Sequence, residues 1–503
     1  MRASHESNAD VGDRANEPVR IDARALRARI VAEGGNLGFT QAARIEASLA
    51  GVRIDTDAVD NSGGVDLSDH EVNYKILLAP LVRSGRLSAE QRHAALFGAS
   101  ADACESVLAH NRGQALALSL DERRSRREPQ SYLRATLALC DEADVDPAAL
   151  GLPSEKIAAE RAAQGRGFVR PELAVMLGLA KLVTRRALAL DAMVDAAYLA
   201  PLFAGYFPPA FRDAWPDALR EHRLRREITA LVATNRLVDA GGAALVASLV
   251  AELGVAIPDV ATALLIAEDL LEIGQRRTAL CALAAVVPRE AVYDALLEVD
   301  RGVRSVARLL VKSGGALLDA TAIERRRSGF AELRAHMDTF LSDLEAAQAR
   351  EREDALTQQG IPPELARDIA MLPLADRALN VLRLSERLPI APAAAARVYS
   401  RIGEGAGIHW AHRRLRDAEA SGLWDRMVLV DLRFDLLDLQ RQLTESVLAS
   451  KPEDPLAAAD AFLKRHEVLL EQIQALEKQI APGDGPSALV VLTSRLRGLA
   501  TAQ

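Results

Sequence analysis

The spacing of apolar residues changes near residue 80. Before that point, two short extended stretches, residues 29–32 and 52–59, each lead into a pair of glycines. Such stretches are typical of strands that end in tight turns. Residues 41–49, which lie between them, have apolar positions at helical spacing and are followed by Gly51. We therefore predict one strand–helix–strand unit, an incomplete Rossmann-like α/β piece that needs further strands from elsewhere for stability.

After residue 78 the pattern changes to amphipathic helices that are separated by Gly and Pro. The clearest helical patterns cover residues 170–189 and 217–240, and residues 424–449 and 455–480 are expected to form an antiparallel pair of long helices. We therefore predict a mainly α fold, in which the α/β piece is followed by a large all-helical region. The expected divisions are a disordered tail at residues 1–17, the α/β piece at 18–86, a helical domain at 87–320 and a C-terminal helical subdomain at 321–503.

Glycine and asparagine residues follow both predicted strands. Gly34, Gly35 and Asn36 follow the first strand, and Asn61 and Gly63 follow the second. In an open α/β sheet, ligands lie beyond the carboxyl ends of the strands, where glycine lets the backbone approach a pyrophosphate, a nicotinamide or a substrate. An asparagine amide both donates and accepts hydrogen bonds, which suits ribose hydroxyls or a carboxamide. The same residues also fit a simple strand-to-helix turn.

Residues 68–71 have the sequence Ser-Asp-His-Glu, the pattern of a capping box, and apolar positions follow it. The pattern predicts a helix that begins at Ser68, so that its free N–H groups and the serine hydroxyl favour an anion in the cleft. An N-cap serine also needs no ligand. Asp66, His70 and Glu71 are candidate metal ligands, but His70 and Glu71 are adjacent in a helix and point in different directions. We interpret these three as structural residues and predict no metal site.

The amino-acid composition excludes several classes of protein. The chain has 503 residues, of which 49% are hydrophobic and 26% charged, the balance of an ordinary globular protein. Its formal net charge of −8 argues against non-specific binding to nucleic acid or to an anionic membrane surface. Three cysteines without metal-ligand spacing suit a reducing compartment. Because no apolar run approaches about 18 residues, we expect a cytoplasmic protein without a membrane span.

Three consecutive segments carry a resemblance to a known family. Residues 33–41 (EGGNLGFTQ), 54–57 (IDTD) and 60–73 (DNSGGVDLSDHEVN) are similar, in this order, to the end of the catalytic region of the large bacterial NAD-specific glutamate dehydrogenases. Residues 169–175 and 222–228 are similar to later stretches of the same family. The resemblance implies an oxidoreductase that converts L-glutamate to 2-oxoglutarate and ammonium, with hydride transfer to NAD.

The resemblance also implies roles for individual residues. In that family, the segment similar to residues 33–36 closes on the cofactor, and an asparagine similar to Asn61 lies near the nicotinamide ribose. A valine and a serine further along contact the substrate glutamate. The residues expected at the cofactor are Gly34, Gly35, Asn36, Asn61 and Gly63, and those expected at the substrate are Gly64, Val65 and Ser68.

The chain departs from the family in one respect. The glycine-rich phosphate-binding turn, the catalytic lysines and the catalytic aspartate of the family lie upstream of the matched region, and there is no room for them before Ile30. No GxGxxG stretch follows a predicted strand. The resemblance therefore implies the C-terminal portion of such an enzyme, inactive alone, which forms a homo-oligomer or joins a partner polypeptide that completes the catalytic domain. The alternative is a non-catalytic helical assembly module with a vestigial cofactor cleft.

Overall fold

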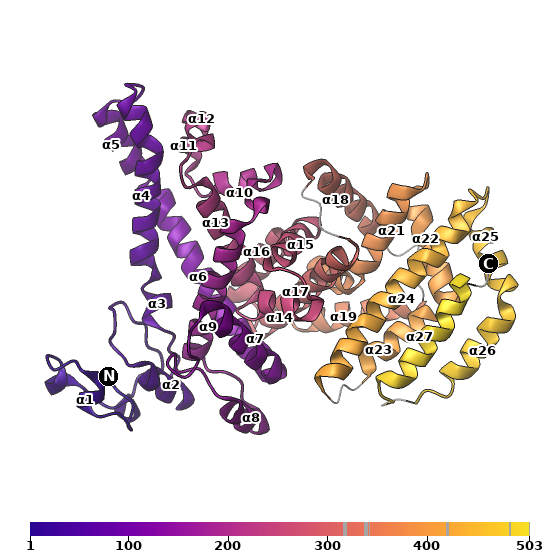
Figure 1. Cartoon of the computed structure of the whole chain (residues 1–503), viewed down its shortest axis with the longest axis horizontal. Coiled ribbons are helices and arrows are strands. Elements are labelled where there is room, and N and C mark those ends of the chain that lie inside the picture. Colours follow the sequence, from indigo (N-terminus) through magenta and orange to yellow (C-terminus); the bar gives the residue numbers. More distant parts are fainter. Residues whose placement is uncertain (315–318, 336–340, 342, 419–421, 482–483, 502–503) are drawn as a thin grey trace. The chain divides into compact units, whose positions relative to one another are not determined.

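The structure, a computed structural model, describes residues 1–503 except 315–318, 336–340, 342, 419–421, 482–483 and 502–503. The described chain consists mainly of α-helices, as expected (Figure 1). Its internal contacts divide it into two compact units, Met1–Leu265 and Ile266–Gln503. The division lies inside one helix and coincides with neither boundary expected at residues 86 and 320, which stay predictions.

The predicted α/β piece is wrong. Within the described ranges, strand pairing is limited to two isolated parallel bridges, Arg2 with Asp22 and Ile30 with Arg53. At the second bridge, the Val31 N–H donates to Arg53 O at 2.8 Å and the Arg53 N–H donates to Arg29 O at 2.9 Å. No Rossmann-like sheet is present in this part of the chain. The physical reason is that a parallel pair without neighbouring strands cannot bury both faces, so the ladder stops after one bridge.

The N-terminal segment is therefore mostly irregular. It contains the helices α1 (Asn8–Val11), α2 (Gln41–Leu49) and α3 (Asp57–Asp60) and the 3₁₀ turns η1 (Glu17–Val19) and η2 (Ala23–Ala25). Residues 1–17, expected to be a disordered tail, include α1, whose N-cap Ser7 forms a capping box with Asp10. Ala3, which precedes this helix, is fully buried. The prediction of a helix at residues 41–49 is confirmed by α2.

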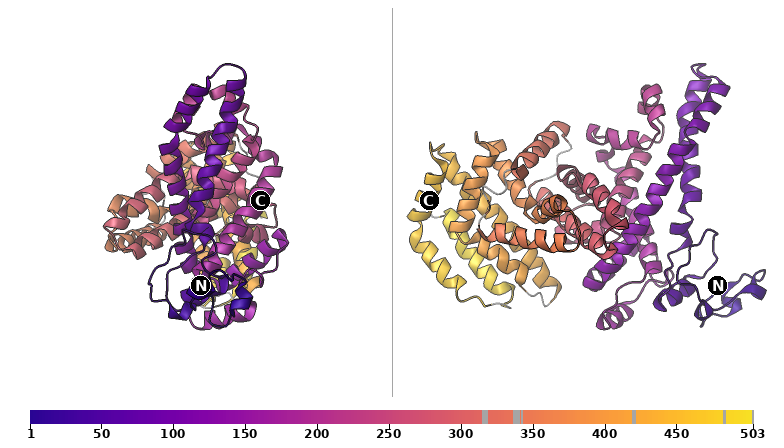
Figure 2. Two further views of the ribbon diagram at one scale, coloured as in Figure 1. Left: turned by 90° about the vertical axis from the view of Figure 1, so that its left-hand side faces the viewer. Right: turned by 180° about the vertical axis from the view of Figure 1, so that it is seen from behind.

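Two long helices dominate the rest of the first unit and lie side by side, as two further views show (Figure 2). They are α4 (Ser62–Arg83) and α6 (Ser100–Arg127), joined through α5 (Ala89–Gly98). The helices that follow are α7 (Pro129–Ala143), α8 (Glu155–Ala163), α9 (Arg170–Leu190), α10 (Ala200–Gly205), α11 (Pro209–Ala214), α12 (Pro216–Arg220), α13 (Arg225–Gly241), α14 (Leu245–Leu253) and α15 (Ile257–Leu270), with 3₁₀ turns η3 (Ala192–Asp195) and η4 (Ala197–Leu199).

The predicted helix at residues 170–189 is confirmed by α9, which has Pro171 in its first turn and buries one face completely. The predicted helix at 217–240 is instead two helices, α12 and α13, which are separated at residues 221–224. Gly241 and Gly242 end α13, because Gly242 has a φ of +85°, a left-handed conformation that favours glycine.

Two apolar cores hold the first unit together. One lies among α6, α7 and α9 and includes Leu118, Leu133, Leu173 and Met176. The other packs α4 against α10, α11 and α12 and is rich in aromatic side chains, with Tyr74 in edge-to-face contact with Phe211. The second core thus packs α4, the helix of the predicted site, against the helices that follow α9.

The second unit is a helical array. It contains α16 (Ile273–Ala282), η5 (Leu283–Ala285), α17 (Arg289–Lys312), α18 (Ala320–Ala335), α19 (Asp343–Gln358), α20 (Pro363–Met371), η7 (Leu372–Leu374), α21 (Ala375–Arg387), α22 (Pro392–Gly405), α23 (Ile408–Asp417), α24 (Leu423–Ala449), α25 (Pro455–Arg465), α26 (Glu467–Glu477) and α27 (Pro486–Thr501). Of the two long helices expected at its end, the first is confirmed by α24. The second is wrong, because the chain breaks at His466 into α25 and α26.

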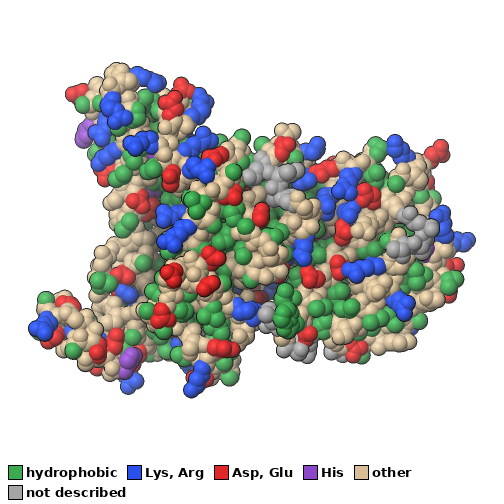
Figure 3. Space-filling view, in the orientation of Figure 1, with side chains coloured by type: hydrophobic (Ala, Val, Ile, Leu, Met, Phe, Trp, Pro, Cys, Tyr) green, Lys and Arg blue, Asp and Glu red, His purple; other side chains and the backbone are tan. Residues whose placement is uncertain are grey.

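The distribution of surface charge and the lengths of the apolar helices relate to two classes of partner, nucleic acids and membranes. On the face drawn in Figure 3, basic and acidic side chains are intermixed over the helices. Among the described residues, no single helix has the length and apolarity needed to cross a membrane. One bent pair, α14 with α15, meets the requirement of length and composition, with an angle of 114° between its two helices.

Candidate cofactor and substrate site

The glycine loop at residues 33–37 is tied to the turn that precedes α4. The Glu33 N–H donates to Asp60 Oδ2, and the Leu37 N–H donates to Asp57 Oδ2, each at 2.9 Å. Gly34 and Gly35 lie between these two attachment points and are exposed, with no atom within 4 Å of the position that a Cβ would take. The loop is therefore held at both ends, and its middle is open to solvent.

A buried ion pair fixes the start of this loop. The Arg44 guanidinium, from α2, donates to both carboxylate oxygens of Glu33, at 2.6 and 2.8 Å, and also contacts Asp57 at 3.1 Å. Glu33 and Arg44 are both buried. Bidentate arginine–carboxylate pairs are strong, and their two parallel hydrogen bonds fix the relative orientation of the two side chains. Arg44 thus connects the loop, α2 and the turn before α4.

The two predicted cofactor asparagines contact each other. Asn61 Nδ2 donates to Asn36 Oδ1 at 2.7 Å, in an exposed position. The sequence places both at strand ends; in the structure they meet although neither strand forms. The loop at residues 33–37 and the beginning of α4 therefore form one continuous polar edge.

Helix α4 begins at Ser62, so the prediction that it begins at Ser68 is wrong. Gly63 and Gly64 lie in its first turn, and the Ser68 hydroxyl donates to Gly64 O at 3.1 Å from the second turn. The physical reason is a partner from α6: Asn111 Nδ2 donates to Val59 O at 2.8 Å and to Ser62 Oγ at 3.2 Å. These bonds steady the chain just before α4, so that the helix begins earlier than the local capping pattern indicates.

The three predicted substrate residues share the exposed side of the first turns of α4. Gly64, Val65 and Ser68 are exposed, and 67% of the Val65 surface is open to solvent. Residues three and four positions apart lie on one face of a helix, so Asn61, Val65 and Ser68 form one row. This row continues the polar edge made by the two asparagines.

Gly63 is the one predicted cofactor residue that faces protein. A Cβ at this position would lie 3.3 Å from Val107 Cγ1 of α6. Glycine here therefore permits the close approach of α4 and α6, which is a packing role.

A second buried ion pair holds the segment before α4 in place. The Arg170 guanidinium, at the start of α9, donates to Asp55 at 2.6 and 3.2 Å and to Glu122 at 3.1 Å. Asp60 lies nearby, and its pKa is raised by burial and by the neighbouring carboxylates of Asp55 and Glu33. Arg170 thus anchors the N-terminal segment on the helical core.

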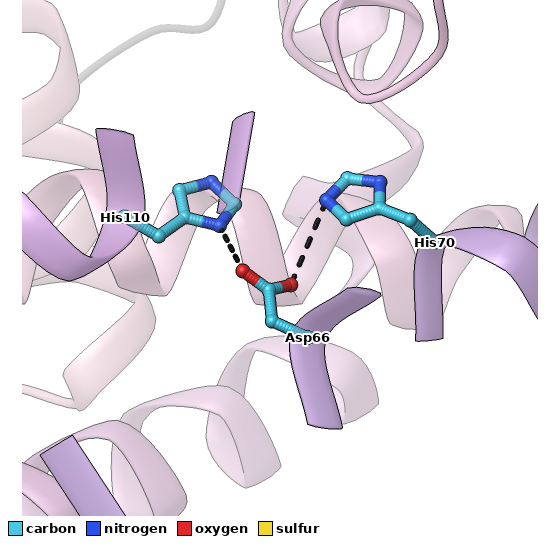
Figure 4. A group of neighbouring side chains, drawn as sticks. All are labelled: Asp66, His70 and His110. Atoms are coloured by element: carbon cyan, nitrogen blue, oxygen red, sulfur yellow. Dashed lines mark hydrogen bonds and ion pairs between the residues drawn. The ribbon is translucent and has the colours of Figure 1, made fainter. Parts of the chain in front are cut away.

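The opposite, buried face of α4 carries Asp66 and His70, which form a cluster with His110 of α6 (Figure 4). The Asp66 carboxylate lies between the two imidazoles, with Oδ2 2.7 Å from His110 Nδ1 and Oδ1 3.6 Å from His70 Nε2. Burial lowers the pKa of His70, and the proximity of His110 lowers the pKa of Asp66 against the opposing effect of burial. The prediction of no metal site did not consider His110, which lies in α6.

Comparison with known proteins decides the family. Residues 1–121 match the family model for the bacterial NAD-glutamate dehydrogenase catalytic domain, and residues 165–498 match the model for the glutamate dehydrogenase C-terminal region. This chain belongs to the bacterial NAD-specific glutamate dehydrogenase family. The catalytic-domain match ends inside α6, so it includes the loop, α4 and the whole predicted site.

Three NAD-specific glutamate dehydrogenases are similar to most of this chain. The protein of Halomonas elongata is 31% identical over 96% of the chain, that of Pseudomonas aeruginosa 32% over 99%, and that of Mycobacterium tuberculosis 30% over 89%. The aligned regions make up 30%, 31% and 28% of the lengths of these relatives. The chain therefore spans about 30% of the length of the curated relatives it matches.

Within this glutamate dehydrogenase segment, the structure brings most of the predicted residues to one exposed edge. Sequence reasoning missed the residues that position them, above all Arg44, Asn111, Arg170 and His110. Arg170 lies in a segment that resembles the family, at residues 169–175, and Arg44 lies in the helix predicted at residues 41–49, but neither pattern indicates an ion pair. Asn111 and His110 carry no local signal, because their roles depend on partners that are distant in the sequence.

Proposed function

We propose that this chain forms one wall of the active-site cleft of an NAD-dependent glutamate dehydrogenase. The reaction is the oxidation of L-glutamate to 2-oxoglutarate and ammonium, with hydride transfer to NAD. One observation carries the proposal: the exposed loop at residues 33–37 is hydrogen-bonded through Asn36 to Asn61, at the start of α4, in a chain that belongs to this family. The loop and the helix together provide neighbouring sites for a cofactor and a substrate.

The cofactor side is formed by the loop and by Asn61. Gly34 and Gly35 leave space for a ligand to contact the backbone, because no side chain covers them. The amides of Asn36 and Asn61 exchange their mutual hydrogen bond for bonds to ribose hydroxyls or the nicotinamide carboxamide. Gly63 acts indirectly, since it lets α4 lie close to α6.

The substrate side is the exposed row on α4. Val65 contacts the carbon chain of glutamate, and Ser68 donates to a substrate carboxylate by turning its hydroxyl away from Gly64 O. The positive end of the α4 dipole lies at Ser62, more than one turn away, so the Ser68 hydroxyl is the group that holds the carboxylate. Gly64 keeps the approach to the helix open.

The groups that move protons lie outside this chain, which supplies binding and orientation only. The purified chain, given L-glutamate and NAD, is therefore expected to form no NADH above the rate of the buffer. The increase of NADH absorbance with time measures this directly. Clear glutamate-dependent turnover would contradict the placement of the catalytic groups elsewhere.

Cofactor binding tests the site separately from catalysis. We expect NADH to bind the chain weakly, and Asn61→Ala to weaken this binding several-fold, as measured by saturation-transfer NMR on the nicotinamide and adenine protons. Asn16→Ala is the matched control, because it removes an exposed asparagine amide that lies outside the candidate site. Equal binding by the wild type and both variants would rule out a cofactor contact at Asn61.

A specific observation also favours the second candidate function, assembly. A groove of about 530 Å³ runs along α7, α9, α13 and α14 in the first unit. Its lining is mainly aliphatic and includes Leu139, Val183, Val246 and Val250. Light scattering of the full chain is expected to give the mass of a dimer or larger species, and Val250→Lys is expected to reduce it. A strictly monomeric wild-type chain would contradict this role.

A further inference from the structure

We propose that Asp66, His70 and His110 bind a divalent transition-metal ion of the Zn²⁺ type, which connects α4 to α6. The cluster lies on the buried face of α4, opposite the row that contains Val65 and Ser68. This inference is independent of the proposed function, because it rests on the geometry of the three side chains.

The spacing of the ligand atoms fits a small cation. One nitrogen from each histidine and one oxygen from Asp66 lie within 4.8 Å of one another. In a tetrahedral site with metal–ligand bonds of about 2.0–2.2 Å, neighbouring ligand atoms are roughly 3.4 Å apart. The two carboxylate oxygens of Asp66 each approach one histidine, Oδ2 at 2.7 Å from His110 Nδ1 and Oδ1 at 3.6 Å from His70 Nε2. Small rotations of the side chains therefore suffice to form the site.

His70 provides the second, independent observation. Only 1% of its surface is exposed, and its Nε2 has no hydrogen-bond partner among the described residues. Asp66 Oδ1 is 3.6 Å away, which is too far for a hydrogen bond. An unpaired buried nitrogen is unfavourable, and a metal ion bound to Nε2 would satisfy it.

The surroundings of His70 hold the ring in a fixed orientation. Tyr74 Oη lies 3.2 Å from His70 Nδ1, and the ring stacks on Tyr206 with centroids 4.2 Å apart. Tyr206 itself accepts a hydrogen bond from Asn73 at 2.9 Å. When the Nε2 atom of a histidine binds a metal, its other ring N–H usually donates to an oxygen, and Tyr74 Oη is placed to accept that bond.

The donor set indicates the class of metal. Two imidazoles and one carboxylate suit Zn²⁺ and related first-row ions, whereas Ca²⁺ and Mg²⁺ prefer oxygen ligands throughout. Asp66 and His70 are four residues apart, so they face the same side of α4, and His110 completes the set from α6. Asp66 and His110 are partly exposed, which gives an ion and one water access to the site.

The test is Zn²⁺ binding to the full chain, purified without a polyhistidine tag. After equilibration with Zn²⁺ and gel filtration, we expect about one ion per chain by mass spectrometry of the metal content. We also expect the midpoint of thermal unfolding to rise by a few degrees with Zn²⁺, because the ion binds only the folded state. His110→Ala is expected to weaken binding at least tenfold, as measured by competition with a chromophoric chelator.

Matched variants separate this site from adventitious binding. His93→Ala removes an exposed histidine of α5, and Cys104→Ser removes an exposed thiol of α6; both are expected to bind Zn²⁺ like the wild type. Co²⁺ is expected to give the visible bands of a four-coordinate nitrogen–oxygen site, and these bands should be absent in His110→Ala. Less than about one ion per ten chains at equilibrium, or equal affinity in the wild type and His110→Ala, would overturn the proposal.

Discussion

The N-terminal segment, residues 1–61, and the C-terminal helices α22–α27 are held together in different ways. The apolar cluster of the segment is small: its fully buried members are three alanines and Ile54, and the larger side chains packed against them, Leu26, Val31, Phe39 and Val52, are only partly buried. The core of α22–α27 contains a continuous set of leucines and isoleucines from every helix of the group. A segment with so little apolar burial depends on ion pairs and hydrogen bonds for its position.

The difference shows how the candidate site is built. The loop at residues 33–37 and the turn before α4 are placed by Arg44 and Arg170, whose bonds have defined directions. Apolar packing is not directional and tolerates small shifts, whereas a buried ion pair loses its stabilisation when its geometry changes. Polar anchoring therefore suits a surface that has to present single amides and hydroxyls to ligands.

The largest expected effect comes from removing one of these anchors. Arg170→Ala leaves Asp55 buried without its partner and is expected to lower the free energy of unfolding of the first unit by about 3–5 kcal/mol. Urea denaturation measures the loss, and hydrogen exchange is expected to rise most in residues 52–61. Arg185→Ala, an exposed arginine of the same helix, is the control and should cost less than about 0.5 kcal/mol. A loss below about 1 kcal/mol in Arg170→Ala would show that the segment does not depend on this ion pair.

The next largest effect is expected from a substitution in the apolar core of α22–α27. Leu436 is fully buried in the core of α22–α27, and Leu436→Ala is expected to cost about 3 kcal/mol through lost burial and the cavity left behind. Hydrogen exchange should rise across the whole group of helices while residues 29–61 stay unchanged. Val468→Ala, an exposed residue of α26, serves as the control. A purely local rise around Leu436 would mean that this core does not unfold cooperatively.

A smaller effect depends on pH. Burial raises the pKa of Glu477 to about 7, from a usual value of 4.5. The unfolded chain therefore loses this proton at lower pH than the folded chain, and the free energy of unfolding should fall between about pH 4.5 and about pH 7 and then level off. Since Glu477 is partly exposed, we expect a change of about 1 kcal/mol.

Glu477→Gln is expected to remove this pH dependence, and urea midpoints at a series of pH values measure it. Glu467→Gln, an exposed carboxylate of the same helix, is the control and should keep the wild-type profile. If the urea midpoints of the wild type and Glu477→Gln depended on pH in the same way, Glu477 would not be the group with the raised pKa.

The smallest effect is expected at the surface of the candidate site. Asn36→Ala removes the exposed hydrogen bond to Asn61 and should cost only about 0.5–1 kcal/mol. Hydrogen exchange in residues 33–37 should rise, with little change in α4. A loss comparable to that of Arg170→Ala would mean that the asparagine pair anchors the loop, and that Arg44 and Arg170 are secondary.

Local patterns predicted those elements whose structure depends on nearby residues. Helix α9 matches its prediction because Pro171 fits a first helical turn and its apolar residues form one stripe. Residues 29–32 did not become a strand, because an apolar stretch needs neighbouring strands that the local pattern cannot supply. The capping pattern at Ser68 placed the start of α4 six residues too late, since Asn111 supports an earlier start.

The sequence by itself determined the family, the mainly helical fold and the positions of the glycines and asparagines, because these are properties of residues and their near neighbours. Only the tertiary structure decided which polar groups meet. Arg170 and Asp55 are 115 residues apart, and Asp66 and His110 are 44 apart. Any one of the chain's many arginines and carboxylates is an equally good partner until folding brings two of them together. The choice is made by the packing of α4, α6 and α9, which the spacing of residues along the chain does not contain.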